Sequence, residues 1–403
     1  MLSYEQARQE VIDRISENKR PPAATEINVW DALGYVLAEE VKADRDYPPF
    51  DRATRDGYAV RAEDTTAGSS LPCAGEIKAG EALSRPLAAR TCVQIMTGAP
   101  APPGADAVVM IEHTKREGEV IHFQQTATRG QNIVPRGSEA SQGRTLLPGG
   151  TRLGYAELGL AAQVGAVKLT CAKKPRVAIL STGDEVVPAD QRPDAFQIRS
   201  SNGVSLSAQV RLAGGEPVML GIAADEVVDL REKIQRGLAE DILVLSGGVS
   251  MGKYDLVEGV LKELGAEFYF DAVAIRPGKP AVFGICGGKA VFGLPGNPVS
   301  TMVTFELFVV PAVDLLSSAA ARPLPLLKAK LLRPLKEKRG MTHFLPAKVE
   351  WENGAPSVSA LSWQGSGDTV TMAKANCFLV VGSETETIFA GESVNVLMRR
   401  DVI

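Results

Sequence analysis

The feature that most constrains the fold of this chain is a turn pattern that recurs between residues 173 and 322. A short apolar run leads into a turn of small residues that carries a carboxylate, first at Leu180–Glu185 and again at Leu245–Asp255. The turn at Gly293–Ser300 has the same form but carries an amide. Apolar residues at helical spacing separate these turns, and this alternation of strand and helix predicts a doubly wound α/β domain. The turns then lie at the carboxyl edge of a parallel sheet, where such domains bind phosphorylated ligands.

The rest of the 403-residue chain divides by composition and periodicity. The first fifty residues predict one helix, a turn at Pro21–Pro22 and a second helix around Val29–Glu39. Residues 51–139 are dense in Gly, Thr, Val and Pro and predict a β-rich domain, and residues 323–403 predict a small β barrel or sandwich. We therefore expect a multidomain α/β plus β protein.

The composition narrows the function classes. A formal net charge of −4 produces no global positive field, so a nucleic-acid partner is not expected. The five scattered cysteines contain no C-x-x-C pair and predict reduced thiols in the cytoplasm. The three histidines lack metal-ligand spacing, which argues against a His-based zinc site and against a Ser-His-Asp hydrolase.

No membrane association is expected. Charged residues interrupt the N-terminus, where a signal peptide would need an apolar core. The most apolar later stretch, Phe305–Leu316, contains Glu306 and Asp314 and is too short to cross a bilayer.

The turns at the sheet edge carry the candidate chemistry. Strand order is expected to bring Glu185, Asp225 and Asp255 side by side, although they are far apart in the sequence. Converging carboxylates repel one another unless a cation lies between them. Mg²⁺ is the expected cation, because it needs only one or two protein carboxylates beside a phosphate. Glycines let the turns approach an anion, and the turn Arg276–Lys279 adds two held positive charges.

Each of these positions also has a purely structural interpretation. Asp225 and Asp255 precede helices and have the form of N-caps, as does Asn297 before a proline. The cluster Ser200–Asn202 precedes a helix and can be read in the same way. The turn Arg276–Lys279 can be a solvated surface turn.

Eight short motifs, taken in order, resemble those of the molybdopterin molybdenumtransferase family, which also includes the C-terminal part of gephyrin. The motifs are Phe50-Asp-Arg-Ala-Thr-Arg-Asp-Gly-Tyr-Ala59, Ile95-Met-Thr-Gly-Ala99, Arg136-Gly-Ser-Glu139, Ser181-Thr-Gly-Asp-Glu185, Ser246-Gly-Gly-Val-Ser-Met-Gly-Lys-Tyr-Asp255, Arg276-Pro-Gly-Lys-Pro280, Gly293-Leu-Pro-Gly-Asn-Pro-Val-Ser300 and Gln364-Gly-Ser-Gly-Asp368. Each motif is weak alone, but the ordered set covers essentially the whole chain and is specific.

The resemblance implies four domains: a segmented helical domain (residues 1–50 and 140–172), an inserted β-rich domain (51–139), a molybdopterin-binding α/β domain (173–322) and a C-terminal β barrel-like domain (323–403). It implies a homodimer whose active cleft lies between the α/β domain of one subunit and parts of the other. The implied reaction takes adenylylated molybdopterin and molybdate, uses Mg²⁺, and releases AMP and the molybdenum cofactor. Further implied partners are the adenylyltransferase that supplies the substrate, and apo-molybdoenzymes or their chaperones.

The resemblance also assigns roles to residues. Catalytic roles fall to Glu185, Asp225, Asp255, Asp56, Thr97 and Glu139, and the first three are also the expected metal ligands. Substrate or phosphate contacts are expected from Ser181, Thr182, Gly183, Asp184, Asn202, Ser246, Gly247, Gly248, Ser250, Arg276, Lys279, Pro295, Gly296, Asn297, Pro298 and Ser366. Two positions depart from the family pattern. Arg276 stands where many members have Lys, and Glu139 follows Arg136-Gly-Ser where others have Arg-Gly-Glu-Asp.

Two other functions stay open at this point. A molybdopterin adenylyltransferase shares the α/β domain, but its usual Ser-Gly-Gly-Thr-Gly turn is replaced here by Ser246-Gly-Gly-Val-Ser250. A gephyrin-like scaffold that binds a receptor peptide is the second alternative. It is less favoured, because no long Pro/Ser-rich linker precedes the core.

Overall fold

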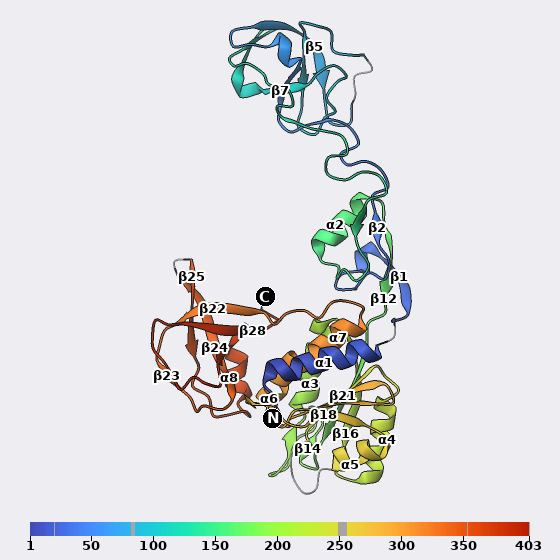
Figure 1. Cartoon of the computed structure of the whole chain (residues 1–403), viewed down its shortest axis with the longest axis vertical. Helices are drawn as coiled ribbons and strands as arrows, with labels where there is room; N and C mark the ends of the chain where they lie inside the picture. The colour runs from blue at the N-terminus through green and yellow to red at the C-terminus, as the bar shows by residue number, and fades with distance from the viewer. Residues whose placement is uncertain (20, 82–84, 249–255, 353, 403) are drawn as a thin grey trace.

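A computed structural model of the chain describes residues 1–19, 21–81, 85–248, 256–352 and 354–402, so the predicted site residues Ser250 and Asp255 lie outside it. Figure 1 shows an α/β domain and a β barrel side by side, with an arm that extends away from them and ends in a β-rich domain.

The α/β domain is built on a six-stranded sheet with the order β16-β13-β17-β21-β20-β18. The strands are β13 (Arg176–Thr182), β16 (Glu216–Ala223), β17 (Ile242–Ser246), β18 (Glu267–Phe270), β20 (Val282–Cys286) and β21 (Lys289–Leu294). The first four strands in this order are parallel, and β20 runs antiparallel to both of its neighbours. A short ribbon of β14 (Val186–Val187) and β15 (Ile198–Arg199) follows β13.

Helices cover both faces of this sheet, because alternate strand residues point to opposite sides. On one face, Val177 and Ile179 share a core with α1 (Tyr4–Asn18), α3 (Ser201–Ala213) and the helix that follows β21. On the other face, Ala178 and Leu180 pack with α4 (Val227–Gly237) and α5 (Leu256–Glu263). The prediction of a doubly wound sheet is confirmed.

The helix after β21 is the most buried element of this domain. It consists of α6 (Pro298–Thr304), a π turn η4 (Phe305–Val309) and α7 (Val310–Leu316). Pro311 has no N–H to donate to the Leu307 carbonyl, which instead accepts a hydrogen bond from Arg8 Nη1 at 2.9 Å. The continuous helix, Pro298–Leu316, is longer than the apolar stretch Phe305–Leu316 that was expected to be too short to cross a bilayer. By length and composition it could cross a membrane, but 89% of its apolar window is buried inside the protein, as in a core helix.

The N-terminal helix α1 packs against α7 and η4 rather than within the arm. A capping box between Ser3 and Gln6 begins it, and Ala7, Val11 and Ile15 form its buried face. The second helix expected around Val29–Glu39 is wrong, since only a 3-10 turn, η1 (Val29–Asp31), forms there. Gly34 adopts a left-handed φ of 78°, and the backbone beyond it bridges to the segments around Arg152 and Cys171 instead of coiling.

The proximal part of the arm is made from two segments that flank the inserted domain. Strands β1 (Ala24–Asn28) and β12 (Lys168–Ala172) pair, as do β2 (Val41–Lys42) and β11 (Thr145–Leu147), beside helix α2 (Tyr155–Gln163). Leu37, Leu153 and Cys171 belong to their common core. The chain therefore returns through this region after the inserted domain.

The inserted domain is a curled sheet with the order β7-β4-β6-β5-β9-β8. Its elements are β3 (Arg52–Ala53), β4 (Gly57–Val60), η2 (Ala62–Asp64), β5 (Ser70–Ile77), β6 (Cys92–Ile95), β7 (Ala107–Met110), η3 (Ile111–His113), β8 (Thr114–Glu117), β9 (Val120–Phe123) and β10 (Ile133–Val134). Strands β3 and β10 pair where the chain enters and leaves the domain.

The C-terminal domain is a closed barrel, as one of the two sequence expectations proposed. The order β24-β25-β22-β28-β26 closes because β24 also pairs with β26. Its elements are β22 (Leu326–Leu331), β23 (Leu335–Lys336), β24 (Thr342–Glu352), β25 (Ala355–Ala360), α8 (Thr369–Lys374), β26 (Cys377–Val381), β27 (Thr387–Ile388) and β28 (Ser393–Met398). Strand β19 (Ile275–Arg276) of the preceding domain adds to β24 and ties the barrel to the α/β domain.

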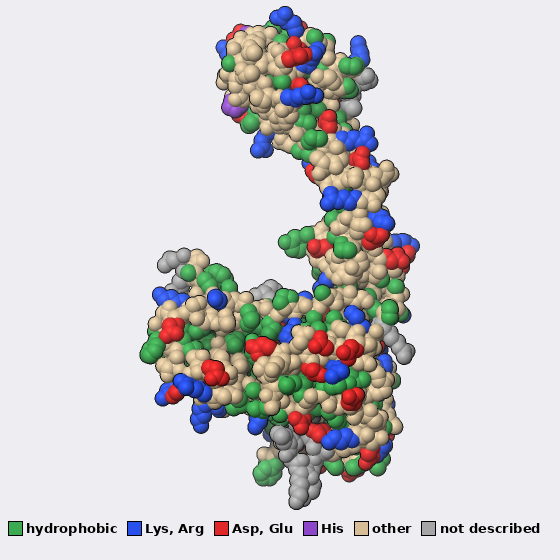
Figure 2. All heavy atoms as spheres, viewed as in Figure 1, with side chains coloured by type: hydrophobic (Ala, Val, Ile, Leu, Met, Phe, Trp, Pro, Cys, Tyr) green, Lys and Arg blue, Asp and Glu red, His purple; other side chains and the backbone are tan. Residues whose placement is uncertain are grey.

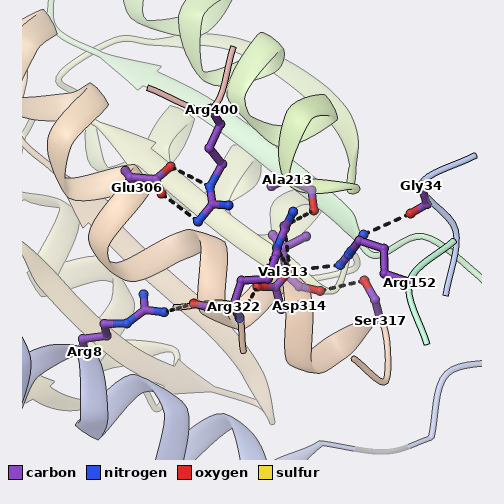
Figure 3. Close-up of polar contacts among 10 residues, drawn as sticks. All are labelled: Arg8, Gly34, Arg152, Ala213, Glu306, Val313, Asp314, Ser317, Arg322 and Arg400. Carbon is purple, nitrogen blue, oxygen red and sulfur yellow. Dashed lines mark hydrogen bonds and ion pairs between the residues drawn. The ribbon is translucent and has the colours of Figure 1, made fainter. Parts of the chain in front are cut away.

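Buried ion pairs join the arm, the α/β domain and the barrel (Figure 3). Asp314 on α7 is fully buried and pairs with Arg152 of the arm at 2.9 Å and with Arg322 of the barrel linker at 2.7 Å. Burial, and then the neighbouring Arg322, lowers the pKa of Arg152. Glu306 pairs with Arg400 just beyond the last barrel strand, and burial raises the pKa of Glu306.

Candidate functional site

Four polar turns meet at the carboxyl edge of the parallel strands and surround a pocket of about 650 Å³, here called the strand-edge pocket. The turns follow β13, β16, β17 and β21, as expected from the sequence. Predicted residues that line it are Ser181, Thr182, Gly183, Glu185, Asn202, Asp225, Ser246, Gly247, Gly248, Pro295, Gly296, Asn297 and Pro298. Sequence reasoning missed Val186, Ile198, Arg199, Pro280, Gly367 and Thr369, which also line it. All of these except Ile198 lie in or beside a motif or cluster noted in the sequence.

Glycines allow the turns to approach one another. A Cβ atom on Gly247 would lie 2.7 Å from the carbonyl oxygen of Thr182, and one on Gly248 would lie 2.8 Å from Thr182 Oγ1. Both glycines have positive φ, of 95° and 62°. The turn after β17 can therefore lie against the end of β13 only because these residues lack side chains.

Acidic side chains gather on one side of the pocket. The Asp225 N–H donates to Asp184 Oδ1 at 3.0 Å. Desolvation, and then the charges of Asp184 and Glu185, raises the pKa of Asp225. Glu226, not Asp225, occupies the N-cap position of α4, so the capping interpretation of Asp225 is wrong.

The described acidic side chains provide fewer ligands than the three expected from the sequence. Within the part of the chain that the structure describes, no three Asp, Glu, His or Cys side chains are arranged to hold a metal ion. Asp255, the third predicted ligand, lies outside the described residues. The described carboxylates still supply the hard oxygen donors that Mg²⁺ prefers.

The cluster before α3 does not cap that helix, contrary to its structural interpretation. Ser200 occupies the N-cap position without a side-chain capping bond, and its Oγ lies 3.3 Å from Ser181 Oγ. Asn202 Nδ2 donates to Ser246 Oγ at 2.8 Å and to the Gly296 carbonyl at 2.7 Å, so the start of α3 is joined to two of the turns. Among the described residues, Asn202 Oδ1 and Thr182 Oγ1 are buried without a hydrogen-bond partner.

Two helices begin at the pocket. Asn297 holds the N-cap position of α6 with Pro298 at the first turn, and no side-chain capping bond forms. Helices α3 and α6 thus begin at the strand-edge pocket, and a helix N-terminus favours anions. In α6 the first residue is a proline without an N–H, and the Val299 N–H donates to the Ser366 carbonyl.

The barrel also contributes to the rim. The carbonyl of Ser366 accepts a hydrogen bond from the Val299 N–H of α6 at 2.9 Å, and the neighbouring Gly367 and Thr369 line the pocket. Asp368 in the same loop caps α8 through Thr371, and these hydrogen bonds lower its pKa.

The two basic residues predicted to bind substrate, Arg276 and Lys279, do not line the strand-edge pocket. Arg276 lines a separate cavity of about 560 Å³ with Lys336, Lys338 and Arg339 of the barrel, together with two glutamates. Lys279 is exposed. The sequence contains the basic residues Lys336, Lys338 and Arg339 before β24. It does not show that they lie beside Arg276, because this depends on the pairing of β19 with β24.

The predicted residues of the arm are far from the pocket within one chain (Figure 1). Asp56 Oδ1 accepts from the Thr97 N–H at 2.6 Å and from Thr97 Oγ1 at 2.7 Å, and these bonds lower the pKa of Asp56. Glu139 pairs with Arg52 at 2.8 Å. Figure 2 shows acidic and basic side chains interspersed on the visible face, in keeping with the small net charge.

Three family models match the chain in succession. They are the MoeA N-terminal region (domain I and II) at residues 2–165, the "Probable molybdopterin binding domain" at residues 178–315 and the MoeA C-terminal region (domain IV) at residues 328–398. The middle model contains every described residue of the strand-edge pocket except those of the barrel loop.

Proteins named molybdopterin molybdenumtransferase are similar over nearly the full length. The one from Nostoc sp. PCC 7120 is 35% identical over 388 residues, which cover 92% of this chain and 88% of that protein. The one from Staphylococcus epidermidis is 31% identical over 395 residues, with coverages of 96% and 94%. A crystal structure of molybdopterin biosynthesis moeA protein from Pyrococcus horikoshii OT3 has a TM-score of 0.79 at 28% identity and covers 99% of this chain and 100% of that chain.

Proposed function

The chain belongs to the molybdopterin molybdenumtransferase family, and we propose that it inserts molybdenum from molybdate into adenylylated molybdopterin and releases AMP. The observation that carries this proposal is the strand-edge pocket, where Glu185 and Asp225 lie beside glycine turns and two helix N-termini, with Asp184 bonded to the Asp225 N–H. Carboxylates and N–H groups in one pocket suit a cleavage of a phosphoanhydride, since the former hold a cation and the latter hold phosphate oxygens. The full-length similarity to molybdenumtransferases does not favour an adenylyltransferase or a scaffold.

Chemical roles follow from the contacts. The Gly248 turn and the start of α3 would receive phosphate oxygens through backbone N–H groups, since the Gly247 N–H already donates to the Leu294 carbonyl and the Val299 N–H of α6 to the Ser366 carbonyl. The buried atoms Thr182 Oγ1 and Asn202 Oδ1 would find in the ligand the hydrogen-bond partners that the described protein does not supply. Arg276 and Lys279 would attract the oxyanion substrate from the barrel side of the domain.

A resident Mg²⁺ fits the donor set. Glu185 and Asp225 would hold it, with Asp255 as the third predicted ligand, and it would screen the charge of molybdate and of the phosphates. Desolvation, and then the charges of Asp184 and Glu185, raises the pKa of Asp225, and a bound cation would relieve the repulsion among these carboxylates.

We further propose a homodimer. Asp56 and Thr97 belong to the inserted domain at the end of the arm, and Glu139 lies where the chain leaves that domain, so these residues can complete the pocket only if a second copy presents its arm to it (Figure 1). The five cysteines are all free thiols, which suits the cytoplasm. The loaded cofactor would pass to apo-molybdoenzymes or their chaperones.

The test uses the purified full-length chain with adenylylated molybdopterin, molybdate and Mg²⁺. AMP is measured by chromatography, and cofactor by reconstitution of an apo-molybdoenzyme. Asp225→Asn removes one pocket carboxylate and is expected to slow AMP release by about 100-fold or more. Glu226→Gln makes the same chemical change at the adjacent exposed N-cap position and is expected to leave the rate within about twofold.

Two results would count against these assignments. Wild-type protein that produces no loaded cofactor from pure substrate would end the proposed function. An Asp225→Asn variant with the wild-type rate would remove Asp225 from the site and leave the function standing.

A further inference from the structure

A second cavity, here called the interdomain groove, lies between the α/β domain and the barrel. It has a volume of about 640 Å³, within the range of small-molecule sites. Helices α3 and α6 form one wall, and α8, β26 and the end of β28 form the other. Apolar side chains make most of its surface: Val204, Ala208, Leu212, Met302, Met372, Phe378 and Met398.

The interdomain groove is continuous with the strand-edge pocket. Arg199, Ser200, Ser201 and Thr369 line both cavities. A ligand with two chemically different ends can therefore occupy both, with a charged end at the glycine turns and an apolar end in the groove.

Polar side chains line the groove beside these apolar ones. Arg400 Nε donates to Glu306 Oε2 at 3.0 Å, and Arg400 Nη2 lies 2.8 Å from Glu306 Oε1 in the same ion pair (Figure 3). Gln209 Nε2 donates to the Met302 carbonyl at 3.1 Å, but Gln209 Oε1 has no partner in the described part of the chain. Glu306 is only 8% exposed, so removing this ion pair from water costs free energy unless further hydrogen bonds form.

These groups match one end of the substrate considered above. A pterin carries two N–H donors and one carbonyl acceptor along its pyrimidine edge. Gln209 Oε1 and Glu306 Oε1 are acceptors, and Arg400 Nη2 is a donor. The methionines and Phe378 on the walls suit a flat ring.

We propose that the interdomain groove binds the pterin ring of the substrate, while the strand-edge pocket holds its phosphates and nucleotide. The identity of the ligand rests on the proposed function, whereas the location of the site rests on the groove itself.

The test measures binding of two probes to the full-length chain. Free pterin (2-amino-4-oxopteridine), followed by quenching of its fluorescence, reports on the groove, and AMP, followed by calorimetry, reports on the strand-edge pocket. Ala208→Trp and Ala373→Trp fill the groove from opposite walls, and both alanines are exposed on helix surfaces. Lys374→Trp places the same side chain on α8 at an exposed position outside the groove.

Both filling variants are expected to weaken pterin binding at least tenfold and to leave AMP affinity within twofold, with Lys374→Trp like wild type. Gln209→Leu keeps the size of the side chain but removes an acceptor, and it is expected to weaken pterin binding about three- to tenfold.

Three outcomes overturn the proposal: no pterin binding by wild type at millimolar concentration, unchanged pterin binding in both filling variants, or a change in oligomeric state alone. The last outcome would assign the groove to a second copy of the chain. If wild type inserts no molybdenum but loses pterin binding in the filling variants, the proposed function fails and the pterin site stands.

Discussion

The buried carboxylate of Asp314 is expected to dominate the stability of the junction between the arm, the α/β domain and the barrel. It is fully buried and accepts four hydrogen bonds, three from Arg322 and one from Arg152. The change Asp314→Asn keeps the shape of the side chain but leaves two guanidinium groups facing each other. Their repulsion already contributes to the lowered pKa of Arg152.

The size of the effect follows from burial. Removing one partner of a buried ion pair costs about 3–5 kcal/mol. The Arg152 and Arg322 side chains keep 22% and 28% of their exposure, so water can partly solvate them and the lower end, about 3 kcal/mol, is expected. A loss of that size lowers the Tm of a domain of this size by about 6–12 °C.

Differential scanning calorimetry of Asp314→Asn measures this loss. Glu350→Gln is the matched control, because it makes the same carboxylate-to-amide change in a half-exposed surface pair with Lys348. The control is expected to change stability by less than about 0.5 kcal/mol. A Tm for Asp314→Asn within 2 °C of wild type would refute the view that this ion pair holds the junction together.

Three further outcomes follow from the structure. Gly248→Ala introduces a Cβ 2.8 Å from Thr182 Oγ1 at a φ of 62°, so AMP affinity measured by calorimetry should fall about tenfold or more; unchanged affinity would mean that the turn is not part of the binding surface. The folded state raises the pKa of Asp225 above its usual 3.8. Between pH 3.8 and that raised pKa the folded state binds more protons at Asp225 than the unfolded state, so the free energy of unfolding falls as the pH rises through this range. Asp225→Asn should therefore unfold at an equal or higher urea concentration than wild type at pH 7, and any gain should vanish below pH 3.8; a loss at pH 7 would contradict the sign. Burial raises the pKa of Cys377 to about 12, so at pH 8 iodoacetamide should modify Cys73, the one cysteine that is not buried, and mass spectrometry showing Cys377 modified first would contradict this.

The alternation of strands and helices between residues 173 and 322 was readable because element type depends on local periodicity. The same holds for the small-residue turns, since only glycine fits their positive φ values. Local patterns failed at Val29–Glu39, where the apolar spacing suits a helix. Gly34 and the cross-chain bridges around Val36 and Leu37 hold that segment extended instead.

Whether a polar residue at a helix start caps the helix or faces a ligand could not be read from the sequence. Asp225, Ser200 and Asn297 all have the composition of caps, yet none makes the capping bond in the structure. Capping depends on the rotamer and on partners from other turns, such as Ser246 and Gly296, which accept hydrogen bonds from Asn202.

The sequence by itself determined most kinds of elements and the residues that could meet at a sheet edge, because these depend on spacing along the chain. Only the tertiary structure decided that α1 packs on α7, that Arg276 lies with the barrel cations, and that the interdomain groove joins the strand-edge pocket. These contacts join residues that are tens to hundreds of positions apart. Strand order and domain docking, rather than any local pattern, bring such residues together.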